Sequence, residues 1–197
     1  MARTKSDKYD SKRNSIMQNA AHLFATNGFS GASVLDISKA CKVSKSLIYH
    51  YYDAKEDILY DVMTGHINEL LSVISDENLI ASDPDQEFYN LTLALLKCYA
   101  GAEHAQKVLL YDLNNLPPEQ RKDIVMKQRA IIERFEQVYV RIFPETKNNT
   151  ALLRSKIMLF FGSLNWVHTW FSPKGPISRT TLAKLAVENS LGTNNTQ

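Results

Sequence analysis

The stretch from Ile16 to Lys55 constrains this chain most, because three short helical patterns and two tight turns follow one another within it. Its first part carries apolar residues at helical spacing (Ile16, Ala20, Leu23 and Phe24), and Gly28 ends that pattern. Helices this short are unstable alone in water and must pack on one another. The stretch therefore predicts a small three-helix domain.

Two N-cap signals mark the start of the second and third helices. Ser33 with Asp36 three residues later resembles a capping box, and Ser44 precedes a short helix over Lys45–Tyr52. Within this last helix Ile48 and Tyr52 are four residues apart and are expected to face inward. The opposite side of the helix then carries hydroxyl, cationic and aromatic groups.

Two helices joined by a tight turn, with polar groups exposed on the second, are the helix-turn-helix arrangement that enters the major groove of DNA. Small side chains near the helix start can approach base edges, while hydroxyls and cations bind phosphates. For any single residue, packing or simple solvation is the alternative. We expect DNA contacts from Ser33, Ser44, Lys45, Ser46, Leu47, Tyr49, His50, Tyr51 and Lys55.

The charge distribution agrees with a polyanion-binding end. Residues 1–50 hold 8 Lys/Arg and 3 Asp/Glu, whereas residues 51–197 hold 15 and 18. The first quarter of the chain is basic and the remainder is mildly acidic, which favours a nucleic-acid partner for the first quarter. The alternative is a charged N-terminus without such a partner, which would have the same composition.

The same stretch resembles the tetracycline-repressor (TetR) family over about the first 60 residues. The resemblance is carried by Ala20–Phe24, Gly28-Phe29, Ser33–Ile37, Val43–Lys45 and Ile48–Lys55. It implies an all-helical homodimeric repressor whose C-terminal domain binds a small effector. Carried over by position, Tyr49, His50 and Tyr51 would bind phosphates and nearby bases, Lys45 would reach DNA from the helix start, and Lys55 would clamp a phosphate.

The rest of the chain reads as further helices with polar breaks, over residues 55–74, 83–100, 103–114, 119–143, 151–171 and 178–191. We expect an all-α protein. Residues 1–55 form the three-helix DNA-binding domain, with helix starting at Ser11 after a flexible tail over 1–10. Residues 56–197 form a larger helical bundle for effector binding and dimerisation.

The helix expected over 151–171 is apolar on nearly every side, so it must be covered on most sides. One face can pack in its own bundle, and the other can meet its copy in a twofold dimer beside the helix over 178–191. The alternative is the central helix of a monomeric bundle. A homodimer also suits the expected DNA-binding domain, because two recognition helices read two half-sites of a near-palindromic operator.

Aromatic and apolar positions with a few polar groups are the usual lining of a small-molecule pocket, although plain core packing is the alternative for each. A second resemblance, over Leu110–Arg121 and Phe161–Ser178, is to TetR regulators of fatty-acid, phenylacetate or sterol degradation, and implies a CoA thioester effector. A different hydrophobic ligand, such as a drug or lipid, stays open. Expected effector contacts are Tyr89, Tyr99, Tyr111, Arg129, Asn165, Trp166, His168, Thr169 and Trp170, with Arg121, Lys122, Lys127 and Arg134 as further basic candidates for the phosphates.

Other classes lack their signatures. Neither Cys41 nor Cys98 has metal-ligand spacing, no histidine has Glu three residues before it, and no phosphate-binding or dinucleotide motif occurs. We therefore expect no enzyme, no metal and no cofactor. Two cysteines and no evident signal peptide suggest a cytoplasmic protein, and no apolar run nears the roughly 20 residues of a membrane span. A protein-interaction adaptor that reuses the helix-turn-helix is the remaining rival.

Overall fold

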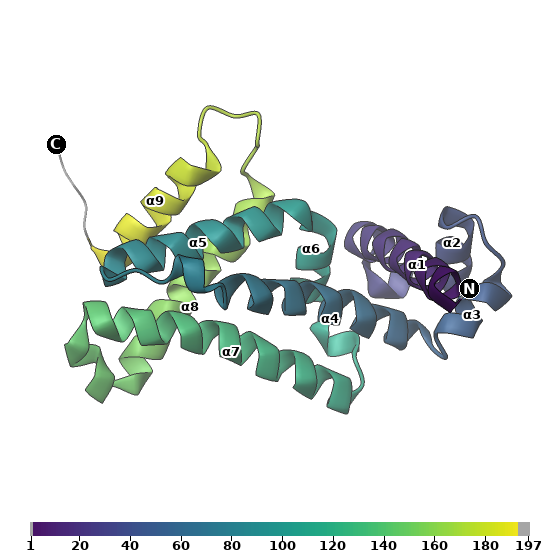
Figure 1. Cartoon of the computed structure of the whole chain (residues 1–197), viewed down its shortest axis with the longest axis horizontal. Helices are drawn as coiled ribbons and strands as arrows, with labels where there is room; N and C mark the ends of the chain where they lie inside the picture. The colour runs from purple at the N-terminus through teal and green to yellow at the C-terminus, as the bar shows by residue number, and fades with distance from the viewer. Residues whose placement is uncertain (1, 193–197) are drawn as a thin grey trace. The chain divides into compact units, whose positions relative to one another are not determined.

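The computed structural model describes residues 2–192, with side chains from Tyr9 onward, and this part of the chain is helical without strands. The all-α expectation is confirmed. The α-helices are α1 Ala2–Gly31, α2 Val34–Ala40, α3 Lys45–Tyr51, α4 Lys55–Ile74, α5 Pro84–Gly101, α6 Glu103–Tyr111, α7 Pro118–Ile142, α8 Thr150–Trp166 and α9 Arg179–Leu191 (Figure 1). Short 3-10 helices cover Glu77–Leu79, Leu113–Asn115, Pro144–Asn148 and Val167–Thr169.

The chain divides into two compact units. The first comprises Met1–Ile67 with Ala102–Val125, and the second comprises Asn68–Gly101 with Met126–Gln197. Helices α4 and α7 each begin in the first unit and end in the second. Among the described residues, none of the helices combines the length and apolar composition that a bilayer crossing needs.

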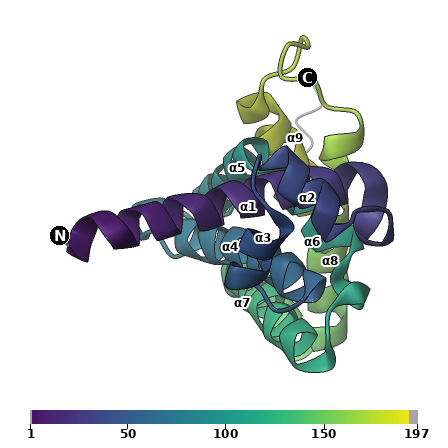
Figure 2. The same cartoon turned by 90° about the vertical axis from the view of Figure 1, so that its right-hand side faces the viewer.

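The first unit is built on α1. Its buried face carries Ile16, Ala20 and Phe24, and both α2 and α6 pack against α1. Gly28 has φ 74°, a backbone conformation that suits glycine, and it breaks the helical path so that the ring of Phe29 packs 5.4 Å from that of Phe24. Figure 2 shows the first turns of α1 extending beyond α2 and α3.

The second unit has an aromatic core. Phe88 of α5, Phe135 and Tyr139 of α7 and Phe160 and Phe161 of α8 stack with centroid distances of 4.9–6.1 Å. Helix α9 packs on α5 and α8. Its ends match the sequence signals, with Ser178 as N-cap and Gly192 at φ 74° as C-cap.

Two expected boundaries were wrong. Helix α1 begins at Ala2, not at Ser11, and residues 2–10 contain no glycine or proline that would break a helix. Helix α8 ends at Trp166, not at Phe171, and a 3-10 turn over Val167–Thr169 follows. Here His168 Nδ1 lies 2.6 Å from Asn165 O and Thr169 Oγ1 donates to Trp166 O, so side chains take carbonyls that a longer helix needs.

Candidate nucleic-acid interface

Both helices of the helix-turn-helix start on the caps that the sequence predicts. Ser33 Oγ accepts from the N–H of Asp36, while the Asp36 carboxylate accepts from the N–H of Ser33 at 3.0 Å, which completes the capping box. The hydrogen bonds from Ser33 lower the pKa of Asp36 below its ordinary value. Ser44 Oγ accepts from the N–H of Leu47 and starts α3. Local hydrogen bonds therefore fix where the recognition helix begins.

The inward face of α3 is as expected. Ile48 is 0 % exposed and Tyr52, which follows the helix as its C-cap, is 7 % exposed. Since α3 has only seven residues, this anchoring holds it in place.

The outward face of α3 holds most of the expected DNA contacts together. Tyr49 is 46 % exposed, and the ammonium of Lys45 lies 5.6 Å from the centre of its ring, within cation–π range. Leu47 and Tyr51 are half-buried on the flanks. The remaining members of the set, Ser33, Ser44, Ser46 and His50, are exposed.

Lys55 has a different environment from the other candidates. Its Nζ donates to the carbonyl oxygens of Phe29 at 2.8 Å and Ala32 at 3.0 Å, and it lies 4.0 Å from the centre of the Phe29 ring. Two of its three ammonium hydrogens are thus directed at the end of α1. The side chain ties the start of α4 to the turn before α2, which pattern reasoning missed.

A second tie joins α3 to α4 through Asp61. Its carboxylate accepts from the Tyr52 hydroxyl at 2.5 Å and from the Arg13 guanidinium at 2.9 and 2.5 Å. Burial, and then the hydrogen bond to Asp61, raise the pKa of Tyr52 above its ordinary value, so the phenol stays protonated as a donor. Sequence reasoning singled out neither Asp61 nor this role of Arg13, because Arg13 lies 48 residues before Asp61 in the chain.

Tyr9 is a further missed residue on this side of the unit. Its ring lies 4.6 Å from that of Tyr51, with an angle of 31° between the planes, and 43 % of the residue is exposed. The second turn of α1 thereby supports an aromatic side chain of α3. Lys5 and Lys8 are further cations suited to a phosphate backbone, but they belong to the first eight residues, whose side chains are not described.

The effector candidates fall into three groups. Tyr99 of α5 and Asn165 of α8 meet in the second unit, where the Tyr99 hydroxyl donates to Asn165 Oδ1 at 3.4 Å, and Tyr89 is half-buried on α5. Five others in this unit are exposed: Arg129, Trp166, His168, Thr169 and Trp170. Tyr111 is exposed and belongs to the first unit.

Among the further basic candidates, Arg134 is already engaged in the second unit. Glu87 of α5 is 1 % exposed, and its two carboxylate oxygens accept from Arg134 and Arg141 of α7, each at 2.6 Å. Burial alone would raise the pKa of Glu87, but these hydrogen bonds and one from the Ala81 N–H lower it below the ordinary value. We therefore read Arg134 as a structural partner of Glu87.

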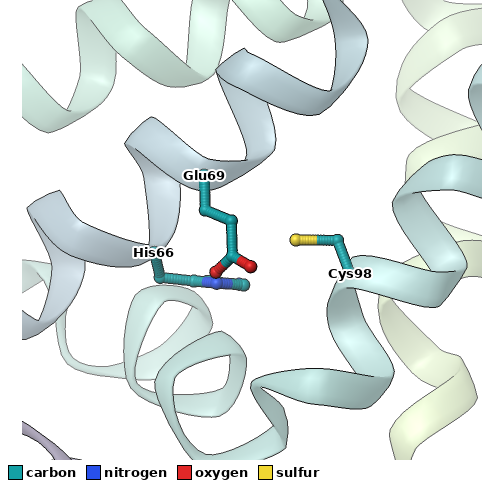
Figure 3. Close-up of side chains that lie close together, drawn as sticks. All are labelled: His66, Glu69 and Cys98. Atoms are coloured by element: carbon teal, nitrogen blue, oxygen red, sulfur yellow. The ribbon is translucent and has the colours of Figure 1, made fainter.

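The same unit holds a buried thiol beside a carboxylate. Figure 3 shows Glu69 of α4 and Cys98 of α5 pointing toward each other, with His66 one turn before Glu69 on α4. Burial, and then the charge of Glu69, raise the pKa of Cys98 to about 11. The thiol is therefore protonated and unreactive near neutral pH.

Family models match both parts of the chain. Residues 16–62 match the model described as bacterial regulatory proteins, tetR family, and residues 81–193 match the tetracyclin repressor-like C-terminal domain. The repressor KstR2 of Mycolicibacterium smegmatis is 24% identical over 177 residues, which is 85% of this chain and 83% of the relative.

Solved structures agree with this assignment. A TetR-family transcriptional regulator from Bordetella parapertussis is 35% identical, with a TM-score of 0.87 over 91% of this chain and 93% of that one. The regulator AibR, solved with isovaleryl coenzyme A and operator DNA, shares the fold at 21% identity, with a TM-score of 0.74 over 90% and 97% of the two chains. The chain belongs to the TetR family and is a DNA-binding transcriptional repressor.

Proposed function

We propose that this repressor binds a near-palindromic operator as a homodimer and leaves it when a small-molecule effector, a CoA thioester, binds its C-terminal part. The observation that carries the DNA-binding half is the exposed, capped face of α3. In this proposal Lys45, Tyr49, His50 and Tyr51 contact bases and phosphates, and Ser33, Ser44, Ser46 and Leu47 complete the surface. The protein acts in the cytoplasm, where a bacterial operator is found.

Lys55 is included as a phosphate contact with a double role. Two of its ammonium hydrogens hold the carbonyls of Phe29 and Ala32, and the third is the one that a phosphate would take. Since those carbonyls belong to the turn before α2, this lysine also positions the helix-turn-helix.

The homodimer is supported by apolar exposure on α8 and α9. Leu159 is 76 % exposed, and Met158, Leu152 and Leu185 are exposed on the same two helices. A cavity of ≈ 210 Å³ opens between them, lined by Lys156, Leu159, Phe160, Ser163, Ala186, Asn189 and Ser190. Large apolar side chains beside a hollow suit a self-complementary twofold contact. Such a pair would set two α3 helices into major grooves about 34 Å apart.

In this proposal the two functions belong to different parts of the chain. Residues 1–55 bind DNA, and residues 56–197 bind the effector and the second copy. Helix α4 begins at Lys55 and is continuous to Ile74, so it connects the DNA-binding residues to the effector-binding part of the chain. The effector disfavours the DNA-bound state by its differential affinity for the two states, on the order of 1–3 kcal/mol.

The thioester assignment is supported by the isovaleryl coenzyme A in the structure of AibR, a protein with which this chain shares the fold. On this chain the Tyr99–Asn165 pair and the half-buried Tyr89 offer a few polar groups on mostly apolar helices, which is the usual material of a small-molecule site. Arg129 is the exposed cation assigned to a phosphate. The exposed Trp166, His168, Thr169 and Trp170 are peripheral contacts in this proposal.

Selection of bound duplexes from a random pool, followed by anisotropy titration of the selected operator, tests the proposal. Isovaleryl-CoA should weaken operator binding by about tenfold or more, whereas free CoA and isovalerate alone should not. Mass spectrometry of small molecules that co-purify with the native protein identifies the natural ligand. If a lipid or drug releases the operator and acyl-CoA does not, the effector is a different hydrophobic ligand.

A further inference from the structure

His22 of α1 and His104 of α6 form a pair of imidazoles within the first unit. Nδ1 of His22 lies 3.0 Å from Nε2 of His104, and the two ring centroids are 4.7 Å apart with an angle of 66° between the planes. Both side chains are exposed. The two residues are 82 positions apart, and the packing of α6 against α1 brings them together (Figure 1).

The backbone beneath this pair is fixed by the packing of the two helices. Ala21 and Phe24 are buried next to His22 on α1, and Val108 and Leu109 are buried on α6. A second link lies at the end of the same helices, where the N–H of Phe29 donates to Asp112 Oδ1 at 3.4 Å. The backbone that carries the two imidazoles is thus held in place, while the rings themselves remain open to solvent.

We propose that His22 and His104 together bind a borderline divalent metal ion, of which Zn²⁺ is the representative. Neutral imidazole nitrogen is a preferred ligand of Zn²⁺, with a bond of about 2.0–2.1 Å. In tetrahedral geometry, two such ligands stand about 3.3 Å apart. The two nitrogens are 3.0 Å apart in the structure, so they need to move apart by only a few tenths of an ångström to bind the ion. The two exposed rings also need to rotate so that both nitrogens face it.

The hydrogen bond between the two imidazoles does not prevent metal binding. In the metal-free pair one ring nitrogen donates its proton and the other accepts, as in any contact of two neutral imidazoles. When the ion binds, the donor ring shifts its proton to its other nitrogen, and both facing nitrogens present lone pairs to the metal. No net proton release is required from a neutral pair.

The site is open on the solvent side. In the described part of the first unit, no third histidine, cysteine or carboxylate forms a group with these two. Water molecules therefore complete the coordination, and the ion exchanges with solvent, unlike the closed four-ligand sites of structural zinc. A bound ion joins α1 to α6 and stabilises the folded first unit, by an amount that grows with the logarithm of the free ion concentration above its dissociation constant.

Isothermal titration of the full-length, tag-free protein with ZnCl₂ tests the proposal. The wild type should bind one ion per chain saturably, and His22→Ala and His104→Ala should each weaken that binding by at least about tenfold. His50→Ala, at an exposed histidine on α3 of the same unit, is the matched control and should leave zinc binding unchanged. Zn²⁺ should also raise the thermal midpoint of the wild type and of His50→Ala, and EDTA should reverse the shift.

Circular dichroism of each variant verifies that α1 and α6 are still folded, and His22→Gln, which keeps a polar side chain, replaces His22→Ala if the latter unfolds. Equal zinc affinity in the wild type and in the His22→Gln, His104→Gln double variant would overturn the proposal. So would the absence of saturable binding at millimolar Zn²⁺.

Discussion

The hydroxyl of Tyr52 donates a hydrogen bond of 2.5 Å to Asp61, and this bond ties the end of the recognition helix to α4. Arg13 of α1 donates to both oxygens of the same carboxylate. Three helices of the first unit therefore share one acceptor, so Asp61 positions α3 although it is not on the DNA-facing surface.

Tyr52→Phe should lower the free energy of unfolding by about 1–3 kcal/mol, because it removes a hydrogen bond to a charged acceptor at a mostly buried site. Urea denaturation measures the loss. Tyr49→Phe removes an exposed phenol from the same helix and should change stability by no more than about 0.5 kcal/mol. Equal effects of the two substitutions would mean that the Asp61 bond adds nothing to stability.

Ser44→Ala should destabilise α3 by about 1 kcal/mol, because the Leu47 N–H loses its capping acceptor. Hydrogen exchange of the α3 amides reports this directly, with faster exchange at Leu47 expected. Ser46→Ala changes an exposed serine inside the same helix and should leave that exchange rate unaltered. Unchanged protection in Ser44→Ala would contradict the capping role.

Lys55→Ala should act on both stability and DNA binding. The loss of two charge-assisted hydrogen bonds should cost about 1–3 kcal/mol of unfolding free energy. Loss of a phosphate contact should weaken binding to all duplexes and reduce the salt slope by about one unit. Lys122→Ala, at an exposed lysine of the same unit, is the stability control. A destabilised variant with an unaltered salt slope would assign Lys55 to folding alone.

Local signals explain why so much of the first unit could be predicted. Ser33 and Ser44 each accept from a backbone N–H three residues later, so spacing along the chain is enough to identify them as caps. Ile48 and Tyr52 are buried because of helical periodicity, which is equally local. The face of α3 that remains exposed follows from these two facts.

Contacts between distant segments could not be predicted in this way. The acceptors of Lys55 lie 26 and 23 residues before it, and they are backbone carbonyls that no sequence pattern marks. One partner of Glu87 is an arginine 47 residues later, so Arg134 looked like any other cation on a basic helix face. Such pairings depend on which helices pack together, and that packing cannot be derived from a single sequence.

The Glu87 cluster should make stability depend on acid pH. Because its folded-state pKa is lowered, Glu87 contributes stability above its ordinary pKa of 4.5, and that contribution is lost as the pH falls through the lower folded value. Glu87→Gln should therefore flatten the decline in unfolding free energy below about pH 4.5. Urea denaturation at several pH values checks this, with Glu133→Gln, an exposed residue of α7, as control. Identical pH profiles for Glu87→Gln and the wild type would contradict the assignment.

Leu159→Glu should separate the proposed dimer, because it places a charge in the apolar patch on α8. Analytical ultracentrifugation should show a shift from dimer to monomer, with operator affinity reduced because the two half-sites are no longer bound together. Met126→Glu introduces the same charge at an exposed apolar residue of α7 and should remain dimeric. A dimeric Leu159→Glu would place the contact elsewhere.

The central claim is that the exposed face of α3 binds operator DNA, and Tyr49 is its most direct probe. Fluorescence anisotropy titration of the selected operator compares the wild type with Tyr49→Ala, after circular dichroism has verified equal helix content. The account predicts a loss of affinity of about tenfold, which corresponds to about 1.4 kcal/mol, for the loss of a stacked and hydrogen-bonded contact. Wild-type affinity in a correctly folded Tyr49→Ala would contradict it.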